Sequence, residues 1–531
     1  IENYFDICNE KDFNLIYDGK FRRRKDRFIN SFDLIKILVE NKKRYLEQIT
    51  KTNELYKTIY DNKITEFKNL EYDETENTKL NEYKEPKEKP NETYYFDFET
   101  TTNTEKKDTV RYHKPYCVFT DKHPNGFFGE NCGEQLLKDL VEKHGVEKGE
   151  KKQTIRLIAH NSTYDFRFLI KYLTVISTIE KGNSLVNANC CYFYENKSIN
   201  IQIRDSLKMI NISLLKFGKV FKLDQEKEIM PYDLYTEENV ERQLINKKIC
   251  LKYVEKEEQE EYLDNCRKIN CIYKVKNSDE ELIDIIKYAG WYCYCDCVVL
   301  KKGYEKFSSM CMEAIKFDSK DYLTLASMAD NYLKYKDCYK DVYQLSGVPR
   351  DFIQQCVVGG RTMCKQNKKQ IRNIDYADYD AVSLYCSAMC RMKGFLRGKP
   401  KVIYNFQPEK YDGYFIKIKI LKVGKKFDFP LQSLKTDEGI RNFTNDLEGK
   451  EIYIDKIALE DLVKFQKVKY EFIQGYYFDE GHNDTINEVM SELFQNRKKY
   501  KKEKNDIQMV FKELMNSSYG KSCLIPIYIF I

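Results

Sequence analysis

The spacing of apolar residues is helical and sparse in the first part of the chain. Apolar positions in residues 32–39 recur at helical intervals, within a region that is otherwise polar. Residues 72–91 are rich in Glu, Lys, Asn and Pro, a composition typical of a linker. The pattern predicts a helical, polar N-terminal extension with a linker over residues 1–92, and it offers no candidate chemistry there.

A different pattern begins at residue 93, where strands and helices alternate. Aromatic and β-branched residues at 93–99 predict a strand, and a second strand at 154–159 leads into a helix at 166–173. Alternation of this kind is typical of α/β domains, so we expect one over residues 93–320. Its further predicted elements are strands at 191–194 and 199–204 and a helix-rich tract at 237–317.

A second strand system follows, so the predicted fold class is α/β and α+β in several domains. The pattern over residues 321–394 predicts a linker followed by an aromatic strand at 371–380. Over residues 395–483, apolar and polar residues alternate in several places, which predicts a β-rich region. Residues 484–531 predict helices and a short apolar tail. The individual elements expected here are strands at 414–420 and 451–455 and helices at 485–504 and 507–517.

Composition indicates a polar chain of several domains. Its 531 residues are too many for one hydrophobic core, and three or four domains are expected. Charged residues make up 33% and the mean hydropathy is −0.66. A transmembrane helix needs a run of about 18 apolar residues, and the sequence has none. We therefore expect no membrane partner.

The net charge of +6 is a weak sign of a nucleic-acid partner, and two local runs say more. Residues 22–25 and 497–502 are almost wholly Lys and Arg, with a Tyr inside the second run. A solvated helix face is the more common reason for such a run. Mixed cations and aromatics also hold phosphates and stack on bases.

The eighteen cysteines predict neither a disulfide scaffold nor a structural zinc site, because none forms a C-x2-C pair and only five His are present. Cys293, Cys295 and Cys297 alternate within an aromatic segment and are predicted to be small hydrophobic residues. We expect an intracellular, reducing compartment, with nucleus, mitochondrion and viral factory all open.

Carboxylates in the α/β region have the spacing of a two-metal site. Asp97 and Glu99 point to one face of a strand, and Asp165 follows a second strand. Tyr292 and Asp296 lie one helical turn apart. A D-x-E pair alone is usually a solvated strand face. The four acids in this order predict two Mg2+ (or Mn2+) ions that cleave phosphodiesters, with Tyr292 orienting the attacking water.

Asp380 ends an aromatic strand, where a carboxylate can hold Mg2+ beside a triphosphate. The next backbone amides, at Ser383 and Leu384, would meet the phosphates, and Tyr385 would lie beneath the sugar and exclude a 2′-hydroxyl. Alone, this pattern is usually a turn that enters a helix. We favour nucleotide binding because a second element, near the C-terminus, matches it.

That second element presents four residues near one helix face, at i, i+4, i+7 and i+8. Lys512 would neutralise triphosphate oxygens, while the other three would form a flat surface against the nascent base pair. An ordinary exposed helix does not explain this N-S-x-Y-G pattern. The predicted nucleotide-binding residues on these helices are Arg497, Lys501, Lys512, Asn516, Tyr519 and Gly520.

The ordered acids resemble the DEDDy 3′-5′ exonuclease domain of family B DNA polymerases. The resemblance implies that Thr100 and Asn161 contact the primer end and that Tyr164 also binds DNA. Ser206 and Leu207 resemble that family's element near single-stranded DNA, although a simple turn after a strand explains them as well.

The later elements resemble motifs A and B of the same family, with Cys386 in place of the usual Pro. Gly359, Gly360 and Arg361 resemble its Y-x-G-G linking element, with Val357 at the Tyr position, and would contact DNA. The resemblance implies an RNase H-like 3′-5′ exonuclease domain followed by a partial palm, a β-rich insertion and helical fingers of a right-hand polymerase.

The insertion at 395–483 resembles that of protein-primed members, found in phages, linear plasmids and self-synthesising transposons. The implied partners are primer–template DNA, single-stranded DNA, dNTPs and a terminal protein primer. The implied function is a DNA-directed DNA polymerase with proofreading.

Nothing after Gly520 resembles the family's Tyr-x-Asp-Thr-Asp turn, and residue 1 is Ile. We therefore expect a C-terminally incomplete fragment that binds nucleotide or DNA without efficient primer extension. Two alternatives stay open: a chain active only as a 3′-5′ exonuclease, and a non-catalytic DNA-binding remnant of a mobile element.

Overall fold

The computed structural model describes residues 67–522, except 68, 81–82, 87–88, 103–112, 148, 226, 361–362, 365–368, 370, 372–374, 376, 378, 382 and 436–440. The helix expected at 32–39, most of the strand at 371–380, Arg361 and the apolar tail lie outside the described residues. The chain divides into two units. The four-stranded unit comprises residues 1–83 and 333–491, and the eight-stranded unit comprises residues 84–332 and 492–531.

The eight-stranded unit is built on one mixed sheet with the order β4-β3-β2-β6-β9-β8-β7. β2, β6 and β9 are parallel neighbours at the centre of the sheet, and antiparallel strands flank them on both sides. The short strand β5 pairs with the first residues of β9. The strands are β2 (Glu92–Thr100), β3 (Pro115–Thr120), β4 (His123–Phe128), β5 (Val146–Glu147), β6 (Thr154–Ala159), β7 (Thr174–Lys181), β8 (Ser184–Tyr194) and β9 (Lys197–Asp205).

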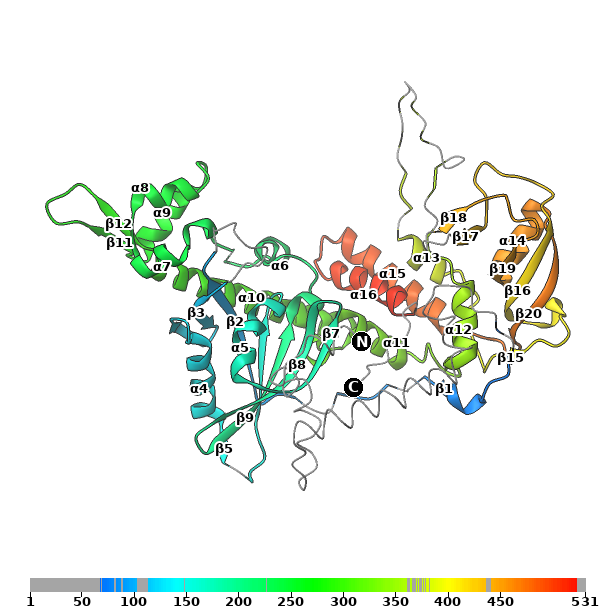
Figure 1. The fold of residues 1–531 in the computed structure, drawn as a ribbon, viewed down its shortest axis with the longest axis horizontal. Coiled ribbons are helices and arrows are strands. Elements are labelled where there is room, and N and C mark those ends of the chain that lie inside the picture. The colour runs from blue at the N-terminus through cyan, green and yellow to red at the C-terminus, as the bar shows by residue number, and fades with distance from the viewer. Residues whose placement is uncertain are drawn as a thin grey trace, which may run out of the picture. The chain divides into compact units, whose positions relative to one another are not determined.

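Strand β2 is buried on both faces, with a different chemistry on each. Tyr94, Phe96 and Phe98 point to one face and share its apolar core with helix α4 (Cys132–His144). Asp97 and Glu99 alternate with them and point to the other face, which helix α10 (Ile285–Ile315) covers (Figure 1). The apolar face fixes the register of the strand, and that register places both carboxylates beneath α10.

Helix α10 has defined ends and a tight contact at its middle. Asp284 caps its first turn by accepting a hydrogen bond from the Lys287 backbone N–H at 2.9 Å, and Lys316 ends it in the left-handed conformation. At Gly303 the helix packs against the ring of Phe217 from α6 (Phe217–Phe221), where a Cβ atom would overlap that ring. Glycine therefore permits the close approach of these two helices.

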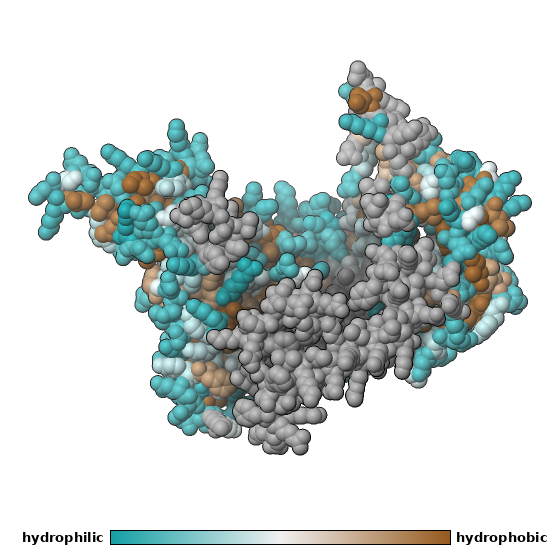
Figure 2. Space-filling model, viewed as in Figure 1, coloured by the Kyte–Doolittle hydropathy of each residue, from teal (hydrophilic) through white to brown (hydrophobic). Residues whose placement is uncertain are grey.

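The tract predicted as helix-rich contains a small subdomain with its own sheet, ordered β10-β12-β11. The strands were missed because three or four residues are too few to show alternation. The face drawn in Figure 2 is mainly hydrophilic there, with isolated hydrophobic side chains. Its elements are α7 (Glu237–Arg242), β10 (Leu244–Asn246), α8 (Lys247–Cys250), α9 (Gln259–Lys268), β11 (Ile272–Lys274) and β12 (Glu281–Asp284).

The two helices predicted near the C-terminus are present as α15 (Thr485–Lys502) and α16 (Gln508–Ser522). Tyr500 stacks on Phe511 with ring centroids 5.6 Å apart. Helix α16 also contacts α10 within the eight-stranded unit. Residues 492–522 therefore return to the unit that the chain left at residue 332.

The four-stranded unit centres on an antiparallel sheet with the order β15-β20-β16-β19. Ile416, Ile418 and Ile420 alternate along β16 and are buried beneath helix α14 (Lys456–Gln466), as Figure 1 shows. The other face packs on helix α12 (Gly347–Cys356). The strands are β15 (Lys401–Val402), β16 (Gly413–Lys422), β19 (Glu451–Asp455) and β20 (Lys469–Phe478).

The described part of the segment predicted as a linker up to residue 80 is instead folded into the four-stranded unit. Strand β1 (Thr78–Lys79) pairs with β13 (Tyr343–Gln344), and the Tyr72 hydroxyl donates to the Pro400 carbonyl. Just before it, Leu70 is buried and its carbonyl accepts a hydrogen bond from the Tyr476 hydroxyl at 2.6 Å. These anchors are single residues in a polar stretch, so local periodicity gave no sign of them.

Helices also occupy residues 321–394, part of which was expected to be a linker. They are α11 (Leu325–Tyr335), α12 and α13 (Leu384–Met389). Among the residues described, no helix is both long and apolar enough to cross a membrane.

We predict that Gly303→Ala lowers the free energy of unfolding of the eight-stranded unit by about 1–3 kcal/mol, because Phe217 must move away from the new methyl group. Trp291 on α10 is the single tryptophan of the chain, so its fluorescence during urea unfolding reports on this unit. Gly520→Ala is the control, since nothing lies within 4 Å of its added Cβ. Equal unfolding midpoints for the two variants would contradict the packing.

Candidate functional site

Three parallel strands bring their carboxyl ends to the same edge of the eight-stranded sheet. Glu99 lies at the end of β2, Asn161 follows β6, and Asp205 ends β9. Ligands of open α/β sheets bind outside this edge. A cleft of about 830 Å³ opens here, and Asp97, Glu99 and Asp296 are among the residues that line it.

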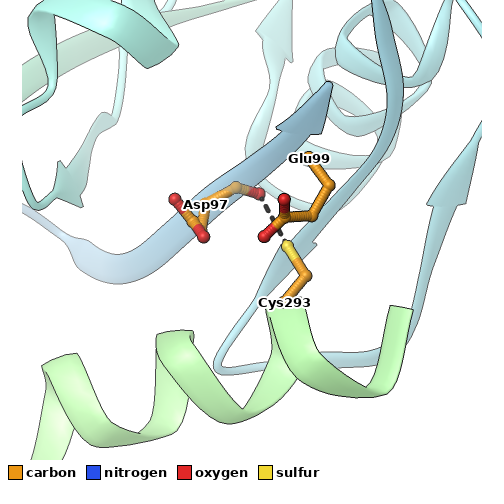
Figure 3. Close-up of side chains that lie close together, drawn as sticks. All are labelled: Asp97, Glu99 and Cys293. Carbon is orange, nitrogen blue, oxygen red and sulfur yellow. Dashed lines mark hydrogen bonds between the residues drawn. The ribbon is translucent and has the colours of Figure 1, made fainter. Parts of the chain in front are cut away.

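The structure brings the four predicted acids together. Figure 3 shows the Asp97 and Glu99 side chains reaching from β2 toward α10, which carries Asp296 on its buried side. Asp165, in the first turn of α5 (Thr163–Leu169), is 2% exposed and accepts a hydrogen bond from the Phe98 backbone N–H at 3.2 Å. That bond ties the start of α5 to β2 and holds the fourth carboxyl behind the cleft wall.

Burial is the main cause that raises the pKa of all four carboxyls. For Asp97 the neighbouring thiol of Cys293 and the other three carboxyls add to this effect. The pKa of Asp165 rises to about 8. At neutral pH the cluster must therefore either keep protons or bind cations. Buried carboxylate oxygens are the donors that Mg2+ and Mn2+ prefer, so the donor set fits such ions.

Lys227 supplies a positive charge at this cleft that the sequence analysis did not predict. Its ammonium forms an ion pair with Asp296 and lies 4.9 Å from the centre of the Tyr292 ring. Burial alone would lower the pKa of Lys227, but Asp296 beside it raises that pKa. No spacing or periodicity marks this residue in the sequence, because only the fold brings it to α10.

Tyr292 is fully buried, and its hydroxyl lies 2.7 Å from the hydroxyl of Tyr232. Tyr232 is 49% exposed and lines the cleft. The predicted water-orienting tyrosine thus has a second tyrosine between it and solvent. Tyr232 was not predicted, since it lies 60 residues before Tyr292 with no motif to connect them.

Asp205 links the loops that carry the predicted DNA contacts. Its Oδ1 accepts hydrogen bonds from the backbone N–H groups of Asn161, at 2.9 Å, and Leu207, at 3.0 Å. Asn161 is held in the left-handed conformation, with φ 70°. The buried Ser206 hydroxyl donates to the Ala159 carbonyl at 2.9 Å. One carboxylate therefore joins the turns that follow β6 and β9.

Four of the five predicted DNA contacts in this unit line the cleft: Thr100, Asn161, Tyr164 and Leu207. The hydroxyls of Thr100 and Tyr164 are hydrogen-bonded to each other across its wall. Ser206 is the exception, because it is 1% exposed and holds the turn from behind.

A second cleft, of about 710 Å³, lies beside the small subdomain. Its lining mixes cations with acids and so does not concentrate one kind of charge. The charged residues that line it are Asp233, Lys248, Lys252, Glu255 and Lys256.

The motif A residues lie in the four-stranded unit. Ser383 precedes α13 with φ 50°, and Leu384 and Tyr385 are about half exposed. A Cβ added to Gly360 would lie 2.9 Å from the Tyr385 hydroxyl, whereas Gly359 has open space. The Gly359–Gly360 element and the motif A element, which were predicted separately, thus lie together. Asp380 is exposed.

The motif B residues lie on α16 in the eight-stranded unit. Lys512, Asn516 and Gly520 are exposed at i, i+4 and i+8, while Tyr519 is partly buried. The Lys512 ammonium lies 3.3 Å from a Glu513 carboxylate oxygen. Arg497 and Lys501 are on α15. Since Asp380 belongs to the other unit, a shared cleft for Asp380 and Lys512 stays a prediction.

Comparison with known proteins identifies the family. Residues 149–527 match the family described as DNA polymerase type B, organellar and viral. This match covers most of the chain, and the chain belongs to that family. The resemblance found in the sequence motifs is therefore confirmed at the level of type B DNA polymerases.

A curated relative is the probable DNA polymerase of Ascobolus immersus, 23% identical over 449 residues. The alignment covers 78% of this chain and 34% of the relative, so the chain spans about a third of that protein's length.

Solved structures show a similar mixed α/β fold. Phi29 DNA polymerase in an orthorhombic crystal form has a TM-score of 0.53 at 17% identity, covering 81% of this chain and 67% of that one. Its ternary complex with primer-template DNA and incoming nucleotide has a TM-score of 0.52, with the same identity and coverage.

The raised carboxyl pKa values predict how the stability of the metal-free protein depends on pH. A carboxyl whose pKa is higher in the folded state binds more protons there, so stability falls as pH rises through the window between the two pKa values. For Asp165 the window runs from 3.8 to about 8. Each such carboxyl contributes a slope of up to about 1.4 kcal/mol per pH unit.

Urea unfolding can be followed by Trp291 fluorescence in a buffer with a metal chelator. The free energy of unfolding should decrease between pH 5 and pH 8, a range that lies within the Asp165 window. Asp165→Asn should flatten the slope, and Asp279→Asn, on an exposed loop, should not. Added Mg2+ should stabilise the wild type more at the higher pH, since metal binding needs deprotonated ligands. A pH-independent wild type would contradict the buried acid cluster.

Proposed function

We propose that this chain is a DNA-directed DNA polymerase polypeptide of the protein-primed type, with a 3′-5′ proofreading exonuclease in its eight-stranded unit. Family membership and the phi29-like fold support the polymerase assignment. The observation that carries the exonuclease is the meeting of Asp97, Glu99 and Asp296 at one cleft, with the carboxyl of Asp165 buried close behind them. The parallel strands β2, β6 and β9, flanked by antiparallel strands, support the RNase H-like fold that we propose for this unit.

In the exonuclease, Asp97, Glu99, Asp165 and Asp296 would hold two Mg2+ or Mn2+ ions. Such ions supply Lewis acidity and lower the pKa of a bound water when present. The ammonium of Lys227 stabilises the negative charge of Asp296. It would also stabilise the negative charge that develops on the phosphate during cleavage. The Tyr292–Tyr232 hydroxyl pair orients a water at the phosphodiester.

The single-stranded 3′ end is held by the other residues of the cleft. The hydroxyls of Thr100 and Tyr164 and the side chain of Asn161 face the sugar and the last base, while Leu207 packs against a base. Asp205 acts as a positioning residue, because it fixes both loops through backbone N–H groups.

For polymerisation, Asp380 would hold the metal ions, with Ser383, Leu384 and Tyr385 against the triphosphate and sugar of a dNTP. Lys512, Arg497 and Lys501 attract the phosphates, and Asn516, Tyr519 and Gly520 face the nascent base pair. Gly359, Gly360 and Arg361 follow the template. The attacking group is a primer 3′-hydroxyl, or a terminal protein hydroxyl at initiation.

Exonuclease activity alone is a second candidate function of this chain. It is favoured by one observation: all predicted nuclease residues lie within a single unit, whereas Asp380 and Lys512 are in different units.

The full chain should degrade 5′-labelled single-stranded DNA from its 3′ end in Mg2+ or Mn2+. Asp97→Ala and Asp165→Ala should each lower the rate by about two or more orders of magnitude, because charge stabilisation of several kcal/mol is lost. Asp279→Ala controls for loss of a carboxylate elsewhere. Digestion at an unchanged rate in both site variants would overturn the exonuclease assignment.

Lys512→Ala should weaken dNTP binding by about 10-fold or more, because a charge-assisted contact to phosphate is worth about 1.5–3 kcal/mol. Equilibrium dialysis with a labelled dNTP measures this. Lys252→Ala, on the small subdomain, is the charge-matched control. Equal binding by wild type and Lys512→Ala would rule out the nucleotide role of α16.

A further inference from the structure

Cys293 lies inside the carboxylate cluster, although the sequence predicted a small hydrophobic residue there. It comes from α10, one residue after Tyr292, and its thiol donates to the backbone carbonyl of Asp97 at 3.3 Å. Its sulfur and one carboxylate oxygen each from Asp97 and Glu99 all lie within 4.8 Å of one another. Figure 3 shows the three side chains converging from strand and helix.

Asp296 provides a second, independent sign of a ligand at this place. It is 2% exposed and lines the same cleft as Asp97 and Glu99. Its Oδ2 is paired with Lys227, but its Oδ1 has no hydrogen-bond partner among the described residues. Buried oxygens are almost always satisfied by a partner, so an ion or water is expected at this atom.

We propose that Cys293, Asp97 and Glu99 form a site for a thiophilic divalent ion such as Zn2+ or Cd2+, and that Asp296 faces it across the same cleft. A sulfur donor shifts the preference of a site away from Mg2+ and toward these softer ions. Such an ion binds sulfur at about 2.3 Å and carboxylate oxygen at about 2.0–2.2 Å, and the three ligand atoms already lie within 4.8 Å of one another.

The donors also dictate what such an ion would do. A thiolate beside two carboxylates binds a soft ion in preference to Mg2+, because sulfur is a poor ligand for Mg2+. The ion would occupy the same carboxylates as Mg2+ and exclude it. The site is therefore inhibitory: a thiophilic ion blocks hydrolysis while Mg2+ supports it. This consequence rests on the proposed exonuclease, whereas the binding of the ion does not.

Direct binding is tested on the full, reduced, metal-stripped chain by titration with Cd2+ in excess Mg2+. The readout is the ultraviolet charge-transfer absorption of cadmium bound to thiolate. Because the chain has eighteen cysteines, the difference between variants is what counts. Cys293→Ser and Cys293→Ala should each lose the signal of one bound equivalent. Cys311→Ser, buried on the same helix, should keep it.

Glu99→Gln should weaken the same equivalent without removing a thiol, which distinguishes a mixed site from a lone cysteine. Identical titrations of wild type, Cys293→Ser and Cys293→Ala would overturn the proposal. Circular dichroism and Trp291 fluorescence show that each variant is folded.

The inhibitory role is tested by adding Zn2+ to the Mg2+-supported exonuclease reaction. Cys293→Ser should need at least about tenfold more Zn2+ for half inhibition than wild type or Cys311→Ser, as expected for the loss of one strong ligand. Equal sensitivity would refute this role while leaving the exonuclease in place. A chain without nuclease activity that still loses one cadmium equivalent in Cys293→Ser would refute the exonuclease and keep the metal site.

Discussion

The burial of four carboxyl groups where strand β2 meets helices α5 and α10 is the constraint on which the eight-stranded unit depends. Like charges in a low-dielectric site repel one another and lose their hydration, which is why burial raises their pKa values. The opposite face of β2 offsets this cost, since Tyr94, Phe96 and Phe98 are packed in the core beneath α4. A backbone hydrogen bond to Asp165 and the ammonium of Lys227 stabilise the rest. The arrangement remains poised to bind cations.

Strand topology converts this cluster into a cleft with a defined direction. Parallel β2, β6 and β9 bring three chain segments to one edge, and Asp205 joins the turns after β6 and β9 through backbone N–H groups. The side chains that line the cleft are thereby attached to rigid elements, which hold their geometry. Helix α10 adds Tyr292, Cys293 and Asp296 from a separate part of the chain.

The chain order also connects the two proposed activities within one unit. Helix α16, which carries Lys512 and Asn516, contacts α10, and the loop before it is joined to the turn after α6 by an ion pair of 2.7 Å between Lys222 and Asp506. The helix that carries the predicted nucleotide-binding residues therefore packs against the helix that carries Asp296. A change in the packing of α10 would therefore alter both the carboxylate cleft and the position of α16.

The sequence by itself determined the family, the strand that carries Asp97 and Glu99, the helical spacing of Tyr292 and Asp296, and the exposed face of α16, because each is a short-range pattern. It misjudged the polar segment around Tyr72, and it missed the strands β10 to β12, which are too short to show an alternating pattern. Lys227, Tyr232 and the position of Cys293 were decided by tertiary structure alone. These residues reach the carboxylates only when α10 packs across β2, and local periodicity does not encode which distant segments meet.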